Sequence, residues 1–546
     1  MDLIEYDDEE TSETEDAPAE ELNDFFYEQN ETIHSSSFRP YVYKQNNTSK
    51  RRNKANILRE RSGLLPNGRV GTIMDSFHKF FDDEMIETIM HYSNLKAASK
   101  NTEMFSKEEL LAYIGLSIIM GIHNDTKRSI PELWSDEGSY HYPGTMSKHR
   151  FKEIASLITF DDKSTREEKK KIDKFAPMRE IYEKLNEKLP KMFKPGANLC
   201  VDEMLSLFRG RCAFKVYQPD KPGKYGFLIR MVADCDTNYI LKMDFYSGKS
   251  STMNNSASEV VKRLISPWIL SGRNITMDRY YTSVDLAESL YQHQLTVVGT
   301  LNANRKHIPD ELKIASGRDK NTSIFCFTNP DDPFPPVTLQ SFIPRKGKVL
   351  FFLSTQHDQE EYIDDEKQMS VINKFYNKTK GTVDNCDQMV RQYSVKRQTR
   401  RWTMSIFATF VDIMLLNGYA LFIMNFPEWN ENRIDRRKLF LRELAMGLIK
   451  PLVEKRAENL NGFRMKTLSA MEKILGRDLK SKEDQITAPK QGTSQRCYKC
   501  LNEAEINHTI RKMSKCSIIC DNCQKTICGK HTKKVCFCSP GCENNH

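Results

Sequence analysis

Apolar residues recur every three or four positions in two stretches of the first third of the chain. The stretches are Phe77–Tyr92 and Leu110–Ile122, and weaker repeats extend the pattern from Asp75 to about Lys191. A repeat of this period places the apolar side chains on one face of a helix, where they can pack against a neighbour. The pattern therefore predicts a helical domain over residues 51–196.

The pattern changes after Pro195-Gly196. Five short runs, bounded by Gly, Pro, Asp or Asn, are typical of strands: 198–208, 225–234, 239–245, 274–278 and 296–301. Helical stretches at 258–269 and 283–292 separate the last three. Three strands followed by helix, strand, helix and strand is the order of an RNase H-like sheet, in which an antiparallel meander continues through helical crossovers. We expect a multidomain chain whose α/β RNase H-like core comprises residues 197–304 and 371–393.

Three further segments complete the predicted organisation. Short β-like runs over 305–370 predict a β-rich insertion, helical periodicity returns over 394–475, and a polar linker spans 476–496. The near-apolar run Ser405–Phe426 is long enough to cross a bilayer, but Asp412 at its centre would cost about 2.5–3.5 kcal/mol there. We interpret the run as a buried helix and expect no membrane partner.

The charge of the chain is unevenly distributed. The 546 residues are 39% apolar and 29% charged, which excludes a wholly disordered chain, and their net charge is +8. Residues 1–37 contain 14 acidic and no basic residues; without them, 60 acidic residues face 82 basic ones, a net charge of about +22. We expect residues 1–50 to be an acidic disordered head with a basic linker, and the basic body to bind a polyanion, with nucleic acid favoured over an anionic membrane.

The first residues indicate where the protein works. Met1–Asp8 has neither the basic nor the apolar region of a secretory signal, so we expect an intracellular protein. The basic run 49–54 is either a nuclear signal or a solvated linker, and with a DNA partner the nucleus is the expected location.

Carboxylates fall where an RNase H-like core requires them. Such a core holds two divalent cations on either side of an in-line phosphoryl displacement, with carboxylates at strand ends as ligands. Asp202 lies in the first predicted strand, Asp278 ends the fourth, and Asp384 or Asp387 begins a later helix, on one of its faces. Any one of them could instead be a cap or turn residue, but the two strand acids lie in apolar strings where an unpaired carboxylate is costly. Oxygen ligands select Mg²⁺ or Mn²⁺.

Six collinear strings carry a resemblance that is more specific than spacing. The chain resembles the piggyBac family of DDE/D transposases from about residue 75 to its C-terminus, in DEMLSLFRGRCAF (202–214), KPGKYGF (221–227), NITMDRYYTS (274–283), VGTLNANRK (298–306), YNKTKGTVDNCDQM (376–389) and RQTRRW (397–402). The resemblance implies that Asp202, Asp278 and Asp384 are catalytic metal ligands and that Asp387 is a fourth ligand or a supporting acid. The family usually has Gly where this chain has Thr382, which raises the question of backbone strain there.

The resemblance also implies an activity and an assembly. It implies cut-and-paste transposition: nicking of double-stranded DNA at the transposon terminal repeats, hairpin formation and opening, and joining of the 3′-OH ends to TTAA targets. The helical segments before residue 195 and after residue 394 would form one dimerisation and DNA-binding domain, so we expect at least a homodimer on DNA. No nucleotide cofactor is expected, since the chain has no GxxxxGK[ST] loop.

Basic residues near these aspartates are the candidates for DNA contacts, although each could equally be an ordinary surface cation. One set flanks the first and fourth strands: Arg209, Arg211, Lys221, Lys224 and Arg279. A second set follows the third aspartate: Lys396, Arg397, Arg400, Arg401 and the aromatic Trp402. Trp402 would either stack on an unpaired base, worth about 1–3 kcal/mol, or belong to the core.

The last 50 residues hold nine of the 14 cysteines, which in a reducing compartment indicates metal binding rather than disulfides. Four ligand pairs predict a cross-brace finger at 497–546 with two Zn²⁺ ions: Cys497 and Cys500, Cys520 and Cys523, Cys528 and His531, Cys536 and Cys538. The first and third pairs would share one zinc, while Cys516 and Cys542 compete for places in the second site. The finger is expected to bind transposon-end DNA, with a protein-interaction finger as the alternative.

Three functions compete at this point. An active transposase is favoured because all four carboxylates are present. The second is a domesticated DNA- or chromatin-binding protein that keeps the fold without catalysis, and the third is a zinc-dependent ubiquitin ligase or histone reader with a passive body.

Overall fold

The computed structural model describes residues 57–219, 221, 223–248, 254–328, 335–364, 369–479 and 495–501, with short pieces at 20–21, 43–44, 515–516, 525–526 and 529–531. The chain separates into two compact units, Met1–Leu475 and Gly476–His546. The predicted linker therefore begins where the first unit ends. The domain boundaries that we predicted inside the first unit stay predictions, because its contacts group it as one unit.

A mixed sheet runs through the larger unit, and its central strands are β5 (Asn198–Leu207), β7 (Tyr225–Asp234), β8 (Ile240–Phe245), β9 (Asn274–Met277) and β10 (Thr296–Leu301). The first three form an antiparallel meander, and β5 then pairs in parallel with β9, which pairs in parallel with β10. The intervening helices are α10 (Ala257–Ile265) and α11 (Val284–Gln292). The predicted order of elements is confirmed, with ends that differ by at most four residues.

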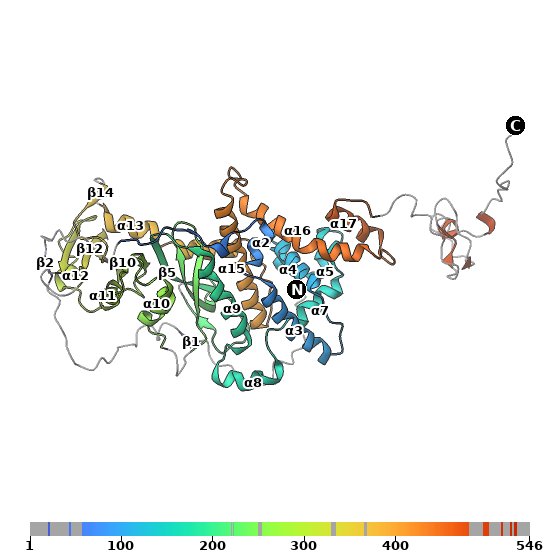
Figure 1. Ribbon diagram of the computed structural model, residues 1–546, viewed down its shortest axis with the longest axis horizontal. Helices are drawn as coiled ribbons and strands as arrows, with labels where there is room; N and C mark the ends of the chain where they lie inside the picture. The colour runs from blue at the N-terminus through green and yellow to red at the C-terminus, as the bar shows by residue number, and fades with distance from the viewer. Residues whose placement is uncertain are drawn as a thin grey trace. The chain divides into compact units, whose positions relative to one another are not determined.

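Helices cover both faces of these strands. α10 and α11 lie on one face, and α13 (Val371–Thr379) and α14 (Thr382–Gln392) lie on the other (Figure 1). Successive strand residues point to opposite faces, so the side chains of β5 divide between them. Cys200 faces α13 and α14, since its thiol donates to the carbonyl of Lys380 over 3.3 Å. Asp202, two residues on, shares that face.

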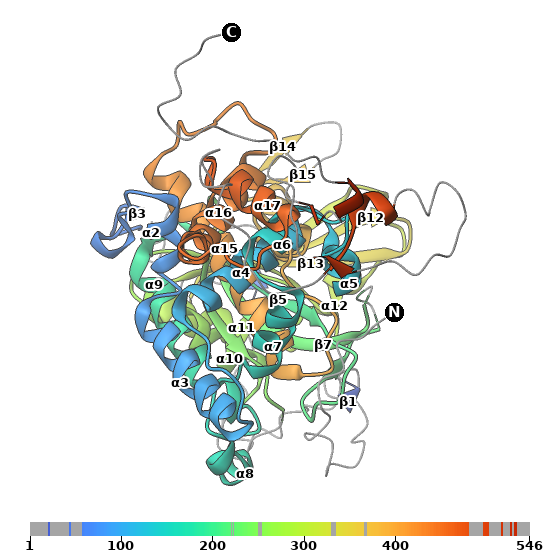
Figure 2. The same cartoon turned by 90° about the vertical axis from the view of Figure 1, so that its right-hand side faces the viewer.

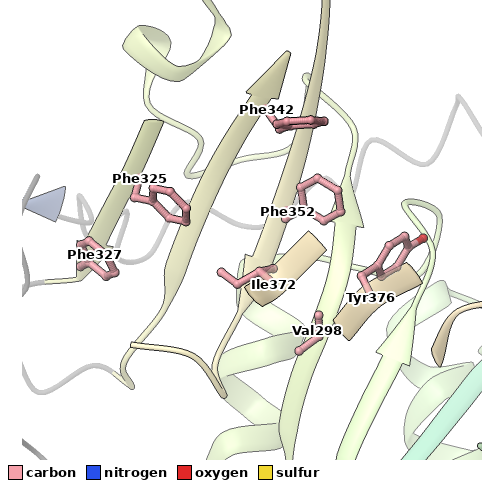
Figure 3. Packing of buried hydrophobic residues seen from close by; sticks show 7 residues of the cluster. All are labelled: Val298, Phe325, Phe327, Phe342, Phe352, Ile372 and Tyr376. Carbon is pink, nitrogen blue, oxygen red and sulfur yellow. The ribbon is translucent and has the colours of Figure 1, made fainter. Parts of the chain in front are cut away.

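The β-rich insertion extends the same sheet and does not form a separate one. Its strands are β11 (Ser323–Thr328), β12 (Thr338–Arg345) and β13 (Lys348–Ser354), and β13 pairs antiparallel with β10. Figure 3 shows the apolar cluster that joins the two parts, in which Phe325, Phe342 and Phe352 of the insertion gather near Val298 of β10 and Tyr376 of α13. The insertion is thus anchored to the strands that carry the candidate site.

The remaining strands are short. They are β1 (Glu20–Glu21), β2 (Tyr43–Lys44), β3 (Gly63–Leu64), β4 (Phe193–Lys194), β6 (Val216–Tyr217), β14 (Tyr362–Asp364), β15 (Met369–Ser370), β16 (Gln495–Arg496) and β17 (Lys515–Cys516). β1, from the segment predicted to be a disordered head, pairs in parallel with β6, and β2 pairs with β11. The rest of residues 1–50 lies outside the described residues.

The helices that precede and follow the sheet in sequence pack together in space. The principal ones are α2 (Ile73–His78), α3 (Asp83–Ser99), α4 (Lys107–Ile122), α7 (Lys148–Leu157), α8 (Lys163–Ile172), α9 (Ala176–Met192), α15 (Trp402–Asn425), α16 (Arg436–Ala457) and α17 (Met465–Leu475), with the shorter α5 (Ile130–Leu133) and α6 (His141–Thr145). The short α12 (Asp310–Lys313) instead contacts β12 of the insertion. In Figures 1 and 2, α4 lies beside α16. A Cβ on Gly115 of α4 would stand 3.0 Å from the carbonyl oxygen of Ala445, so a glycine is required for this close approach.

α15 is the near-apolar run, and the structure places it inside the larger unit. Among the described residues it is the one helix long and apolar enough, by length and composition, to cross a membrane, but 83% of its most apolar window is buried in the protein. Asn417, a polar residue of this helix, has an internal partner: its amide exchanges hydrogen bonds of 2.9 and 2.8 Å with the backbone N–H and carbonyl of Ile240 on β8. The prediction of a buried helix is confirmed.

Candidate active site

Asp202 and Asp278 are brought together by the parallel pairing of β5 and β9. The last register pair between the two strands is Val201 with Met277, so each aspartate stands one residue beyond it. Both strands are held by buried apolar side chains, and β9 is buried along its whole length. Tyr280 donates its backbone N–H to Oδ1 of Asp278 over 2.9 Å, which fixes the turn that leaves the strand. The two carboxylates meet at the sheet position predicted from the sequence.

Burial and the repulsion of neighbouring negative charges disfavour the charged forms of these two carboxylates. Desolvation raises the pKa of Asp202, and the neighbouring charges of Glu203 and Asp278 raise it further. Desolvation, followed by the charge of Glu203, raises the pKa of Asp278 to about 6, although Arg279 opposes the shift. Carboxylates in this position are stabilised in their charged form by a bound cation.

Glu203 was missed by the sequence analysis. It directly follows Asp202 on β5, accepts a hydrogen bond of 3.1 Å from the hydroxyl of Tyr281, and raises the pKa of both aspartates. The signal was present, since a second carboxylate directly follows Asp202 in the sequence.

Asp384 and Asp387 lie on α14, which packs on β5. Asp384 is exposed in the first turn, one turn before Asp387. Asp387 is largely buried and pairs over 2.6 Å with Arg391, which also donates to the carbonyl of Leu205 over 3.2 Å. Burial raises the pKa of Asp387, with Arg391 and Lys221 opposing. Arg391, which the sequence analysis missed, thus ties Asp387 to the edge of β5 that β9 leaves free.

The departure from the family pattern at Thr382 introduces no strain. Gly381 has an ordinary φ of −84°, and Thr382 is the first residue of α14, with its hydroxyl donating to the carbonyl of Thr379 over 2.9 Å. A left-handed backbone, which would favour Gly, is not required at either position.

The oxygen donors suit a hard divalent cation. Oδ1 of Asp387 is buried and has no hydrogen-bond partner among the described residues, and Asp202 and Asp278 have raised pKa values. In the part of the chain that the structure describes, the four aspartates do not form a group with all ligand atoms within 4.8 Å of one another. A single cation therefore cannot contact all four aspartates in this arrangement of α14, β5 and β9.

The first set of predicted DNA-contact residues is mostly exposed, and two of its members interact electrostatically with the aspartates. Arg209, Arg211, Lys224 and Arg279 are exposed, and Arg279 acts electrostatically on Asp278. Lys221 is partly buried and acts on Asp387. Their role in binding DNA stays a prediction.

The second basic set, on the segment between α14 and α15, is largely turned inward. Arg397 donates to the carbonyls of Asp125 and Arg128 over 3.2 and 2.7 Å. Arg401 donates to three carbonyls at the end of α7, those of Ala155, Ser156 and Ile158. These guanidinium groups donate hydrogen bonds to backbone carbonyls at or near helix ends, which is a structural role. Their contact with DNA, also a prediction, would require these bonds to be released.

The other members of this set differ among themselves. Arg400 is exposed, whereas Lys396 donates to the hydroxyl of Ser206 over 2.9 Å. Trp402 packs edge-on against Phe214 with ring centroids 5.2 Å apart, and it lies 6.3 Å from the ring of Phe175. Of the two roles weighed for Trp402, the structure shows the packing contacts, and stacking on a base stays a prediction.

In the second unit, three predicted ligands converge. Cys497, Cys500 and His531 have ligand atoms within 4.8 Å of one another, and Nδ1 of His531 lies 3.4 and 3.5 Å from the two sulfur atoms. This unit therefore contains a possible metal site that joins the first predicted pair to the third. Cys520, Cys523, Cys528, Cys536, Cys538 and Cys542 lie outside the described residues, and the thiol of Cys516 donates to the carbonyl of Gln495.

Known proteins are similar to this chain in both sequence and fold. The family described as Transposase IS4 matches residues 73–419. The chain is 24% identical over 364 residues to human PiggyBac transposable element-derived protein 3, and 22% identical over 365 residues to human PiggyBac transposable element-derived protein 2. Each alignment covers 63% of this chain and 60% of the relative, so the chain spans less than two thirds of these relatives' length.

A solved structure is similar over almost the whole fold. It is a piggyBac transposase synaptic complex with hairpin DNA, with a TM-score of 0.75 and 29% sequence identity, and the match covers 87% of this chain and 99% of that one. Since the family match also covers more than half of this chain, the chain belongs to the piggyBac-type transposase family.

Proposed function

We propose that this protein is a DNA transposase that cuts DNA at transposon ends and joins the freed ends to a target. The observation that carries the proposal is the pair Asp202, in the middle of β5, and Asp278, directly after the adjacent parallel strand β9: each stands one residue past the last register pair, and both have raised pKa values. Asp384 and Asp387, on the helix that packs on β5, would complete the site.

Each residue has a definite task in this proposal. Asp202, Asp278 and Asp384 would hold two Mg²⁺ or Mn²⁺ ions, and the free oxygen of Asp387 would bind one of them or a water beside it. The bound cations supply stabilisation of the attacking and leaving oxygens in an in-line phosphoryl transfer. Arg391 keeps Asp387 against β5, and the basic residues Arg279 and Lys221, which act on Asp278 and Asp387, would orient the DNA backbone.

The proposed reaction sequence uses one site for several nucleophiles. Water nicks the transposon end, the freed 3′-OH attacks the opposite strand to form a hairpin, water opens it, and the 3′-OH joins a TTAA target. The similar solved structure is a synaptic complex with hairpin DNA, which supports hairpin chemistry and an assembly of at least two copies for this chain. We also propose an RNase H-like core and a nuclear location.

We propose that the second unit is a two-zinc cross-brace finger that binds transposon-end DNA. The convergence of Cys497, Cys500 and His531 supports a first site shared by the first and third pairs. Cys528 would complete it as a fourth ligand.

A second candidate function is DNA binding without cleavage. The human relatives are named as transposable element-derived proteins, which supports a domesticated role as the alternative.

Incubation with DNA distinguishes the two functions. The purified protein is mixed with Mg²⁺ and a duplex that carries its transposon end flanked by TTAA, beside Asp278→Ala and the exposed-site control Asp310→Asn. The transposase is supported if the unmodified protein and Asp310→Asn form nicks and hairpins and Asp278→Ala does not. Tight end binding without cleavage in either Mg²⁺ or Mn²⁺ would support the domesticated role.

A further inference from the structure

A buried carboxylate holds the segment that joins α14 to α15, residues 393–401, which we name the connector. Asp412 lies in the middle of α15 with 4% of its surface exposed. Its Oδ1 accepts the backbone N–H of Val395 over 2.9 Å, and its Oδ2 accepts the hydroxyl of Ser394 over 2.5 Å. A charge in an apolar helix is tolerated only where such partners offset its desolvation. Asp412 therefore fixes the start of the connector on α15.

Lys396 fastens the same connector to β5. Its ammonium donates to the hydroxyl of Ser206 over 2.9 Å, and that hydroxyl lies 2.7 Å from the hydroxyl of Thr409 on α15. Ser206 stands four residues after Asp202 on one strand, so the two side chains share a face. The network thus joins the strand of the first aspartate, the connector and α15.

The charges of Lys396 and Asp412 depend on each other. Burial lowers the pKa of Lys396 to about 8, with Asp412 opposing the shift and Arg391 of α14 adding to it. Burial raises the pKa of Asp412 to about 7, with hydrogen bonds from Ser394 and Val395 and the charges of Lys396 and Arg437 opposing. Arg437, from α16, in turn interacts electrostatically with Tyr393 and Tyr419.

The connector begins directly after α14 ends at Gln392. The position of the connector therefore fixes the C-terminal end of α14. α14 is a helix of 11 residues that carries Asp384 in its first turn and Asp387 in its middle, and it packs on β5. A shift of about 1 Å in a catalytic group is enough to cost about 100-fold in rate.

We propose that Lys396 and Asp412 are positioning residues for DNA strand cleavage, which hold α14 and its two aspartates in register with Asp202 on β5. The proposal rests on the proposed transposase function. It gives Lys396 an internal role in place of the DNA contact that the sequence suggested.

The test compares Asp412→Asn, Lys396→Met and Ser206→Ala with Asp310→Asn, which alters an exposed Lys–Asp pair of the same residue types. Single-turnover cleavage of the end duplex is measured beside the dissociation constant for that DNA and the hydrogen exchange of residues 382–396. For Asp412→Asn and Lys396→Met we expect cleavage to fall about 10- to 100-fold. DNA affinity should stay within about twofold, and exchange in α14 should become about tenfold faster or more.

The pH profile provides a readout that a purely structural role would not change. Lys396 loses its proton above its pKa of about 8, so the cleavage rate of the unmodified protein should fall on that side. Asp412→Asn removes the negative charge that supports the lysine and should move this fall to lower pH. Lys396→Met should abolish it, and Asp310→Asn should leave it in place.

Two results would overturn the proposal. One is an unchanged cleavage rate and unchanged exchange in both Asp412→Asn and Lys396→Met; the other is a loss of DNA affinity in Lys396→Met that accounts for its loss of cleavage. If Asp412→Asn does not fold, Ser206→Ala decides, since it removes the acceptor of Lys396, together with the hydrogen bond to Thr409, and should slow cleavage about threefold or more. If the unmodified protein fails to cleave, the proposed function is wrong, whereas exchange in α14 still tests whether Lys396 and Asp412 hold the helix.

Discussion

Asp202 and Asp278 each stand one residue past the pair Val201–Met277, the last register pair between β5 and β9. The sheet thereby places two carboxylates side by side in a partly desolvated position, where their repulsion opposes folding. Pairs of this kind are typical of functional sites, where they lower the stability of the fold. The buried strands around the pair offset this loss of stability.

Replacing Asp278 with Asn should therefore stabilise the protein while it abolishes the reaction. The amide keeps an oxygen that can accept from the backbone of Tyr280 but removes the charge, so we expect a gain of about 1–3 kcal/mol in the free energy of unfolding at pH 7.5 without added Mg²⁺. Cleavage should fall by about 10³-fold or more. Urea unfolding and the end-cleavage assay measure the two effects, with Asp310→Asn as the exposed control. A less stable Asp278→Asn that still cleaves would contradict both the geometry and the proposed function.

The stability difference between Asp278→Asn and the unmodified protein should depend on pH. The pKa of Asp278 is raised to about 6 in the folded state, above its ordinary value of 3.8, so the folded protein takes up this proton first. Lowering the pH through 6 toward 4 therefore stabilises the unmodified protein relative to the variant, and the advantage of the variant should vanish near pH 4. Melting temperatures of both proteins between pH 4 and 8 test this. A difference that stays constant over that range would show that the carboxylate does not titrate as described.

The sequence was most informative where the structure depends on local periodicity. Strands 225–234 and 296–301 have the predicted bounds, and α15 lies within four residues of the apolar run, because alternation and helical repeats are visible in a short window. The positions of Asp202 and Asp278 followed from the order of the strands. The pairing of β13 with β10 could not be predicted, since it joins residues about fifty positions apart and no local pattern specifies it.

Side-chain roles inside the candidate site were harder to predict. Arg397 and Arg401 look like members of one basic DNA-binding run, yet Arg397 donates to the carbonyl of Arg128 and Arg401 to that of Ile158 at the end of α7, contacts that are decided in three dimensions. Asp412 was interpreted only as an argument against a membrane helix, because its partners Ser394 and Val395 lie seventeen or more residues away.

Arg401 and Arg209 should respond to substitution in opposite ways. Arg401→Ala leaves three carbonyls at the end of α7 without this donor, so we expect a loss of about 2–4 kcal/mol in the free energy of unfolding. Arg209 is exposed beside β5, so Arg209→Ala should change stability by less than about 0.5 kcal/mol but should weaken DNA binding and reduce its salt dependence by about one phosphate contact. Denaturant unfolding and DNA titrations at several salt concentrations separate the two. Arg401→Ala with full stability and a reduced salt dependence would instead show that its guanidinium leaves α7 to bind DNA.

Cys497 should hold zinc and Cys516 should not. The sulfur of Cys497 lies 3.4 Å from Nδ1 of His531, whereas the thiol of Cys516 donates to the carbonyl of Gln495. We expect Cys497→Ser to lower the zinc content by one ion per chain and Cys516→Ser to leave it unchanged, as measured by elemental analysis of the purified proteins. Because residues 57–475 belong to a separate compact unit, the main unfolding transition should keep its midpoint in both variants while Cys497→Ser loses affinity for the end duplex. Zinc loss from Cys516→Ser would mean that the ligand pairs are assigned wrongly, and unchanged DNA binding by a zinc-depleted Cys497→Ser would favour a protein-interaction role for the finger.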